Sequence, residues 1–131
     1  MKRLFFMLLA GLLLTGCIGG ILGTPKYEWN VKKYDYDGVD YIGVTGVVTN
    51  VSRSAHGVGS IVAYALSGET VLDKKYIPSS AWLEPYKELR FTFLFKKEDV
   101  PGITHIKLAI SSSNKEPYDN VTDQAMLFDL R

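Results

Sequence analysis

The alternation of side chains between residues 87 and 95 constrains the fold of this 131-residue chain more than any other feature. In this segment Leu89, Phe91, Phe93 and Phe95 form one set, which alternates with a mostly polar set, Glu88, Arg90, Thr92 and Leu94. Successive side chains of a β-strand point to opposite faces of a sheet. The pattern therefore predicts a strand whose apolar face lies at the centre of a hydrophobic core.

Six further segments rich in Val, Ile, Tyr, Phe and Thr lie between clusters of Gly, Pro, Asn and Ser, as is typical of short strands. They cover about residues 27–34, 41–50, 58–66, 70–77, 103–111 and 125–130. No segment of more than about ten residues has a helical period with capping residues. We therefore predict an all-β domain, a single immunoglobulin-like antiparallel sandwich of about seven strands.

The N-terminal segment predicts export and a lipid anchor. A basic start, Lys2-Arg3, precedes an apolar run over residues 4–14, and Leu14-Thr15-Gly16 leads to Cys17, the only cysteine of the chain. This arrangement resembles a lipoprotein signal peptide at residues 1–16, with lipid carried on the sulfur of Cys17 after cleavage. The alternative is an uncleaved membrane anchor, because the apolar run to residue 22 nearly spans a bilayer. Gly11, Gly16, Gly19 and Gly20 interrupt this apolar run, which favours the lipoprotein interpretation.

The predicted organisation places the folded domain close to a membrane. Residues 17–26 are Gly-rich and contain Pro25, which indicates a short flexible tether between the lipidated cysteine and the domain at residues 27–131. At about 3.3 Å per extended residue, this tether reaches roughly 30 Å. We expect an exported protein held at the cell membrane or elsewhere in the cell envelope.

The charge of the chain argues against nucleic acid as a partner, and its cysteine content argues against a stabilising disulfide. Cleavage removes Lys2 and Arg3 from 15 basic residues, so 13 remain against 14 acidic ones. Such a near-neutral chain lacks the positive field that binds phosphate backbones, so we predict no nucleic-acid partner. With Cys17 bound to lipid no thiol is left to pair, so the domain must be stable without a disulfide.

Part of the domain resembles a known family. A strand that enters Gly46-Val47-Val48-Thr49-Asn50, the corner Leu83-Glu84-Pro85 and the aromatic segment Phe91-Thr92-Phe93 together resemble the FxLYD type of immunoglobulin-like domain, over about residues 44–95. The resemblance implies an exported or lipid-anchored sandwich with no catalytic residues. Ser67 and Tyr86 depart from the usual Asp and Gly of that family. Gly46 is expected to permit close approach of strands, and Asn50 to bond turn backbone.

No catalytic or metal-binding motif is present. The two histidines, His56 and His105, show no spacing to ligands that predicts a metal site, and no nucleophile elbow accompanies them. We therefore predict no enzyme activity and no cofactor. Residues 35–40 hold three aspartates around Gly38 and superficially resemble a calcium loop, although the closing Glu is missing. A hairpin turn is the favoured interpretation.

Exposed aromatic residues are the candidate ligand-binding groups. They are Trp82, Tyr86, Tyr36 and Tyr41. Such rings can form a platform for a sugar or a peptide. For Trp82 we favour a structural role as a plug at one end of the sandwich. Asn50 and Asn120 fit the N-glycosylation pattern.

The sequence thus favours a lipid-anchored envelope protein that acts as a non-catalytic binding or structural module, with an envelope protein as partner. A carbohydrate-binding surface built from the exposed aromatics is the alternative. A third alternative, an enzyme whose carboxylates only the fold assembles, has least support, because few nucleophiles or bases are available. The oligomeric state is not indicated.

Overall fold

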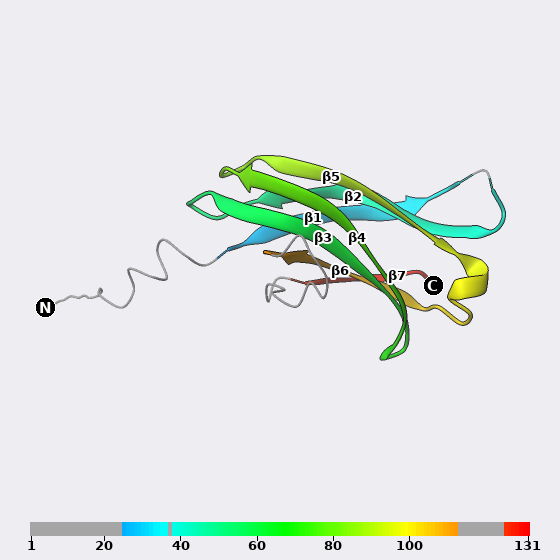
Figure 1. Cartoon of the computed structure of the whole chain (residues 1–131). Coiled ribbons are helices and arrows are strands. Elements are labelled where there is room, and N and C mark those ends of the chain that lie inside the picture. The colour runs from blue at the N-terminus through cyan, green and yellow to red at the C-terminus, as the bar shows by residue number, and fades with distance from the viewer. Residues whose placement is uncertain (1–24, 37, 113–124) are drawn as a thin grey trace, which may run out of the picture.

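Two antiparallel sheets pack face to face in this computed structural model, which describes residues 25–36, 38–112 and 125–131 (Figure 1). The strands are β1 (Tyr27–Tyr34), β2 (Tyr41–Asn50), β3 (His56–Ser67), β4 (Thr70–Leu83), β5 (Glu88–Lys96), β6 (His105–Ser111) and β7 (Met126–Asp129). One sheet has the order β1-β2-β5 and the other β4-β3-β6-β7. The predicted seven-stranded immunoglobulin-like sandwich is confirmed, with β4 paired to β3.

The strand boundaries follow the predicted ranges closely except in β4. We predicted that this strand ends near residue 77, just before Pro78. The structure continues it to Leu83. β4 is an edge strand of the described sheet, so Pro78 forms no ladder bond on its outer side. The register with β3 shifts close to Pro78, between Val58 and Ser60.

The core forms where the predicted apolar face of β5 meets the other sheet. Phe91, Phe93 and Phe95 are buried, and Phe95 has no exposed surface. Trp29 of β1 packs against Phe91 edge to face, with 5.8 Å between the ring centroids. Ile106 and Leu108 of β6 complete the opposite wall. The alternation in the sequence therefore places the core as predicted.

Strand β3 is buried on both of its faces at its middle. Ile61, Ala63 and Ala65 point into the core between the sheets. Val62 points to the outer side of the four-stranded sheet, yet it has no exposed surface, and its cross-strand neighbour Ala109 on β6 has none either. The sequence of a strand that is buried on both faces is a continuous apolar run rather than an alternation of apolar and polar residues.

Strands β1 and β2 form the predicted hairpin, with Tyr34 opposite Gly43 at its last paired position. Asp37 lies outside the described residues, so the calcium alternative for residues 35–40 stays untested. Residues 1–24, with the predicted signal peptide and Cys17, also lie outside them. Within the described ranges the structure has no helix that is long and apolar enough to cross a membrane.

Candidate functional site

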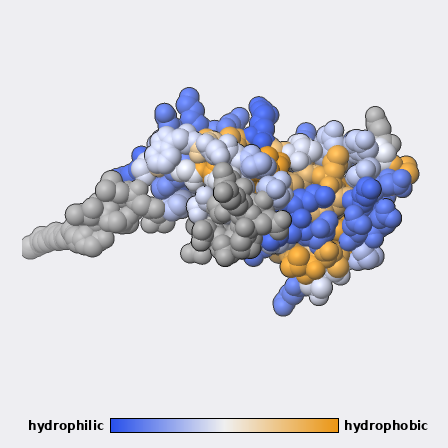
Figure 2. Space-filling model, viewed as in Figure 1, coloured by the Kyte–Doolittle hydropathy of each residue, from blue (hydrophilic) through white to orange (hydrophobic). Residues whose placement is uncertain are grey.

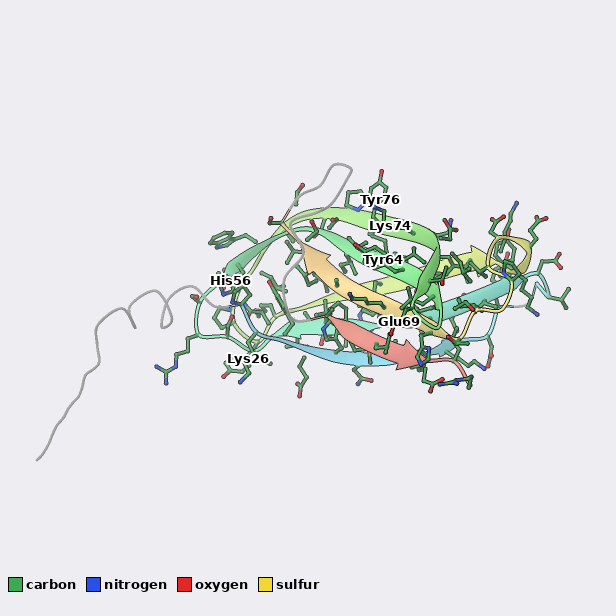
Figure 3. The ribbon with its side chains drawn as sticks, turned by 90° about the horizontal axis from the view of Figure 1, so that it is seen from below. Lys26, His56, Tyr64, Glu69, Lys74 and Tyr76 are labelled. Atoms are coloured by element: carbon green, nitrogen blue, oxygen red, sulfur yellow. The ribbon has the colours of Figure 1, made fainter. Side chains whose placement is uncertain are left out.

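The outer face of the four-stranded sheet carries a row of cross-strand neighbours with mixed chemistry. Tyr64 of β3 stands opposite Lys74 of β4 on one side and Lys107 of β6 on the other, and Lys107 stands opposite Leu127 of β7. The ammonium nitrogens of Lys74 and Lys107 lie 6.0 and 5.9 Å from the centroid of the Tyr64 ring. Both distances allow a cation–π attraction. Figure 3 shows Tyr64 and Lys74 on this face. The row thus presents an aromatic ring between two positive charges.

A groove of about 480 Å³ begins at this row and extends to the β3–β4 hairpin. Its lining residues are Tyr64, Leu66, Gly68, Glu69, Val71, His105, Lys107, Ala125, Met126 and Leu127. The hairpin curves over the edge of the sheet in Figure 1, and hydrophobic surface gathers there in Figure 2. Val71 and Leu127 are 56% and 59% exposed. The groove therefore has apolar walls that solvent reaches.

The hairpin that forms one wall is tied to the start of β6. Gly68, with φ of 61°, lies in the two-residue connection between Ser67 and Thr70, where a glycine adopts the left-handed conformation at little cost. Its N–H donates to Thr104 Oγ1 at 3.0 Å, and the Thr104 N–H donates to the Leu66 carbonyl at 2.8 Å. These bonds fix the hairpin next to the start of β6, and so they fix the position of the groove wall that the hairpin forms.

Charged groups at the edge of the groove are partly neutralised by one another. The Arg131 side chain donates to both oxygens of Asp129, at 3.1 and 3.2 Å, and these bonds, with a backbone bond from Arg131, lower the pKa of Asp129 to about 2. His105 Nε2 lies 3.7 Å from Asp129 Oδ2. Asp129 is therefore ionised at any physiological pH and faces the imidazole of His105. Lys107, beside Tyr64, provides positive charge on the groove floor.

The two histidines lie at opposite ends of the four-stranded sheet. His56 and His105 do not come together, because His56 opens β3 at one end of the sheet and His105 stands opposite Leu66 near the other. Among the residues that the structure describes, no three His, Cys, Asp or Glu side chains gather as a metal site would require. The apolar walls and the Tyr64–Lys107 pair can bind an apolar group that carries a negative charge.

The four predicted aromatic residues lie in two separate groups. Tyr36 and Tyr41 pack edge to face, with 5.2 Å between the centroids, at the β1–β2 connection. Trp82 and Tyr86 lie where β4 leads into β5, at the other end of the sandwich. A single aromatic platform built from all four residues is therefore not formed.

The favoured structural role of Trp82 was wrong. Its side chain is 71% exposed, whereas the next residue, Leu83, is buried in the core. Because neighbouring residues of a strand point to opposite faces, Leu83 occupies the inward position and Trp82 is directed outward. Its ring lies over Gly57, the cross-strand neighbour, where an added Cβ would lie 3.7 Å from two ring carbons.

Asn50 is a structural residue in the folded domain, as its place at a strand end suggested. Its side chain is fully buried. Nδ2 donates to the carbonyls of Leu83 at 2.8 Å and Ser54 at 3.0 Å, and Oδ1 accepts from the Ser52 N–H at 2.9 Å and from the Ser52 hydroxyl. A glycan on Nδ2 has no room in this arrangement. Asn120, the other predicted acceptor, lies outside the described residues.

The groove itself was not predicted from the sequence. Its central residues, Tyr64, Lys107 and Leu127, come from three strands and are far apart along the chain. The only signal was their outward position in each strand. Their meeting depends on strand order and register, which a single sequence does not reveal.

No family model and no curated protein matches the chain. Among solved structures, the CARDB domain of the PF1109 protein from Pyrococcus furiosus, in complex with di-metal ions, is similar, with 17% identity and a TM-score of 0.43 over 82% of this chain and 88% of that one. β-Glucosidase 3B from Thermotoga neapolitana is similar with 13% identity and a TM-score of 0.40, over 80% of this chain. A β-glucosidase from Listeria innocua is similar with 12% identity and a TM-score of 0.36, over 79% of this chain.

The chain spans 16% of the length of each of these two β-glucosidases. Likenesses this distant carry no information on activity or ligands. The resemblance to the FxLYD type stays a hypothesis. The strand order itself shows that the chain has an immunoglobulin-like β-sandwich fold.

Proposed function

We propose that this protein is a lipid-anchored, non-catalytic recognition module of the cell envelope, and that it binds a protein partner through the groove on its four-stranded sheet. The observation that supports this most is the exposure of Val71 and Leu127 on opposite walls of the groove. Protein interfaces have an apolar centre with aromatic residues and a polar rim, and Tyr64 with Lys107 and Glu69 provides that composition here.

The groove also adjoins a strand to which a partner can add. In the described part of the chain β7 forms one edge of the four-stranded sheet, and an edge strand offers unpaired backbone groups. An extended partner segment can pair with such an edge and place alternate side chains into a neighbouring pocket. The partner segment that fits has an apolar side chain next to a carboxylate, which would reach Lys107.

Crosslinking in living cells tests the groove. A photoreactive amino acid at Leu127 is expected to trap one envelope protein, because this side chain is exposed on the groove wall. The matched control position is Val39, which is 79% exposed but belongs to the β1–β2 connection, away from the groove. Leu127→Asp should remove the partner from pull-downs without lowering Tm. Equal crosslinking from both positions, or an unchanged pull-down with Leu127→Asp, would argue against a groove partner.

Replacement of Cys17 tests the anchor. Cys17→Ser removes the sulfur that carries lipid, so we expect the precursor to remain uncleaved and acyl labelling of the protein to be lost. The measurement is electrophoretic mobility together with incorporation of a labelled fatty acid or isoprenoid. Unchanged processing and membrane attachment in the variant would show that the chain is held by an uncleaved apolar segment instead.

A further inference from the structure

Three segments join at the end of the sandwich where the chain enters it, here called the entry end. It consists of Lys26, the β2–β3 connection at residues 51–55 and the β4–β5 corner at residues 82–87. The Val51 N–H donates to the Lys26 carbonyl at 2.9 Å, the Asn50 N–H to the Lys87 carbonyl at 3.0 Å, and the Tyr86 N–H to the Asn50 carbonyl. Figure 3 shows Lys26 and His56 at this end and Glu69 at the opposite one. The entry end is thus one rigid surface.

Two aromatic side chains at the entry end are directed into solvent. Trp82 is 71% exposed and Tyr86 is 75% exposed. In the tight turn where the Lys87 N–H bonds the Glu84 carbonyl at 3.1 Å, Tyr86 has φ of 64°. Glycine is the favoured residue at that position after a proline. A bulky residue there is strained, and such strain concentrates at functional sites.

Within the entry end, the basic side chains outnumber the acidic ones. Lys26, Arg53 and Lys87 are exposed, and Glu84 is the acidic residue of the same loops. Glu28 and Glu88, which are also exposed, lie just outside it, on either side of Thr49 on the three-stranded sheet. Trp and Tyr are enriched where the membrane meets water, and basic residues are attracted to anionic lipid headgroups. The entry end combines both features.

We infer that the entry end docks onto the membrane surface, with Trp82 and Tyr86 in the headgroup region and Lys26, Arg53 and Lys87 on anionic lipids. This inference rests on the proposed lipid anchor. Lys26 follows Cys17 by nine residues, so about 30 Å of extended chain at most separates the entry end from the bilayer. A lipid anchor is strengthened by a second, basic signal. Docking in this orientation turns the β3–β4 hairpin and its groove away from the membrane, toward partners.

Quenching of Trp82 fluorescence in proteoliposomes tests the inference. The full lipidated protein is reconstituted in vesicles of phosphatidylcholine and phosphatidylglycerol, with or without lipids brominated near the headgroups. Trp82→Phe leaves Trp29, which packs in the core, as the remaining indole. We expect brominated lipid to quench the emission of the wild-type protein and to leave that of Trp82→Phe unchanged. We also expect the emission of Trp82 to lie at shorter wavelength in the docked protein than in the undocked protein.

Substitutions separate the aromatic from the electrostatic contribution. Lys26→Gln, Arg53→Gln and Lys87→Gln should each lower the ratio of docked to free domain about fivefold on anionic vesicles, since one basic residue near the surface contributes about 1 kcal/mol. Tyr86→Gly should weaken docking while raising Tm by a few degrees, because it relieves the positive φ. Lys33→Gln, on β1 near the opposite end, is the matched control and should change nothing.

Each outcome has a distinct meaning. If the protein floats with the vesicles but brominated lipid does not quench Trp82, the docking inference is wrong while the anchor stands. If the protein fails to float, the proposed anchor is wrong and the inference falls with it. If Trp82 responds to added glycans and not to brominated lipid, the entry end is a carbohydrate site and the inference is overturned.

Discussion

Asn50→Ala is expected to lower the free energy of unfolding by about 3 kcal/mol. The fully buried Asn50 side chain joins the β2–β3 connection to the β4–β5 corner through the carbonyls of Leu83 and Ser54 and the N–H of Ser52. Alanine removes the Asn50 bonds to the Leu83 carbonyl and the Ser52 N–H, whereas the Ser54 carbonyl keeps a bond from the Ser52 hydroxyl at 3.1 Å. Each buried group left unsatisfied costs about 1–3 kcal/mol. Since a domain of this size has only about 5–15 kcal/mol of stability, urea unfolding should show a clearly lower midpoint.

Two variants establish that the hydrogen bonds of Asn50 are the cause. Asn50→Asp keeps the shape and the acceptor but cannot donate to the two carbonyls when ionised, so it should be destabilised at neutral pH to a similar degree. Asn30→Ala changes an exposed asparagine of β1 and should alter stability by less than about 0.5 kcal/mol. Equal, small effects of Asn50→Ala and Asn30→Ala would contradict the structural role of the buried amide.

Gly46→Ala is expected to cost about 2–3 kcal/mol of stability, in the range of overpacked interiors. Gly46 lies in the middle of β2, opposite Val31 of β1 and Phe91 of β5. A Cβ there would lie 3.0 Å from the Val31 Cα and would collide with the Asn30 carbonyl oxygen. These are backbone atoms, so no rotation of a side chain relieves the contact, and β1 must move away from β2. This close approach confirms the role that the sequence suggested for Gly46.

Gly57→Ala is the matched control for this prediction. An added Cβ at Gly57 would meet the Trp82 ring at an ordinary 3.7 Å. The substitution also reduces the freedom of the unfolded chain, so stability should stay unchanged or rise slightly. Thermal unfolding of both variants makes the comparison. If Gly46→Ala proved as stable as Gly57→Ala, the contact between β1 and β2 at Gly46 would not limit side-chain size.

The strands were predictable because their signal is local. The large apolar residues of β5 and β6 recur at every second position, and the β3–β4 turn at Gly68 lies between the predicted segments 58–66 and 70–77. β4 was predicted too short. The strand continues past Pro78 because β4 is an edge of the described sheet, where a missing donor is tolerated, and a single sequence does not show which strands are edges. The plug role favoured for Trp82 was wrong, since the predicted strand ended before the alternation that directs Leu83 inward and Trp82 outward.

The sequence by itself determined the fold class, the boundaries of most strands and the inward set of large apolar side chains, since each depends on a two-residue period along one segment. The lipid anchor at Cys17 remains a prediction from the sequence. Only the tertiary structure decided which outward residues gather on one surface: Tyr64, Lys107 and Leu127 at the groove, or Trp82 and Tyr86 at the entry end. Outward residues need not be apolar, so the sequence pattern does not show which of them are neighbours. Their neighbours are set by strand order and register, which arise only when distant segments pair.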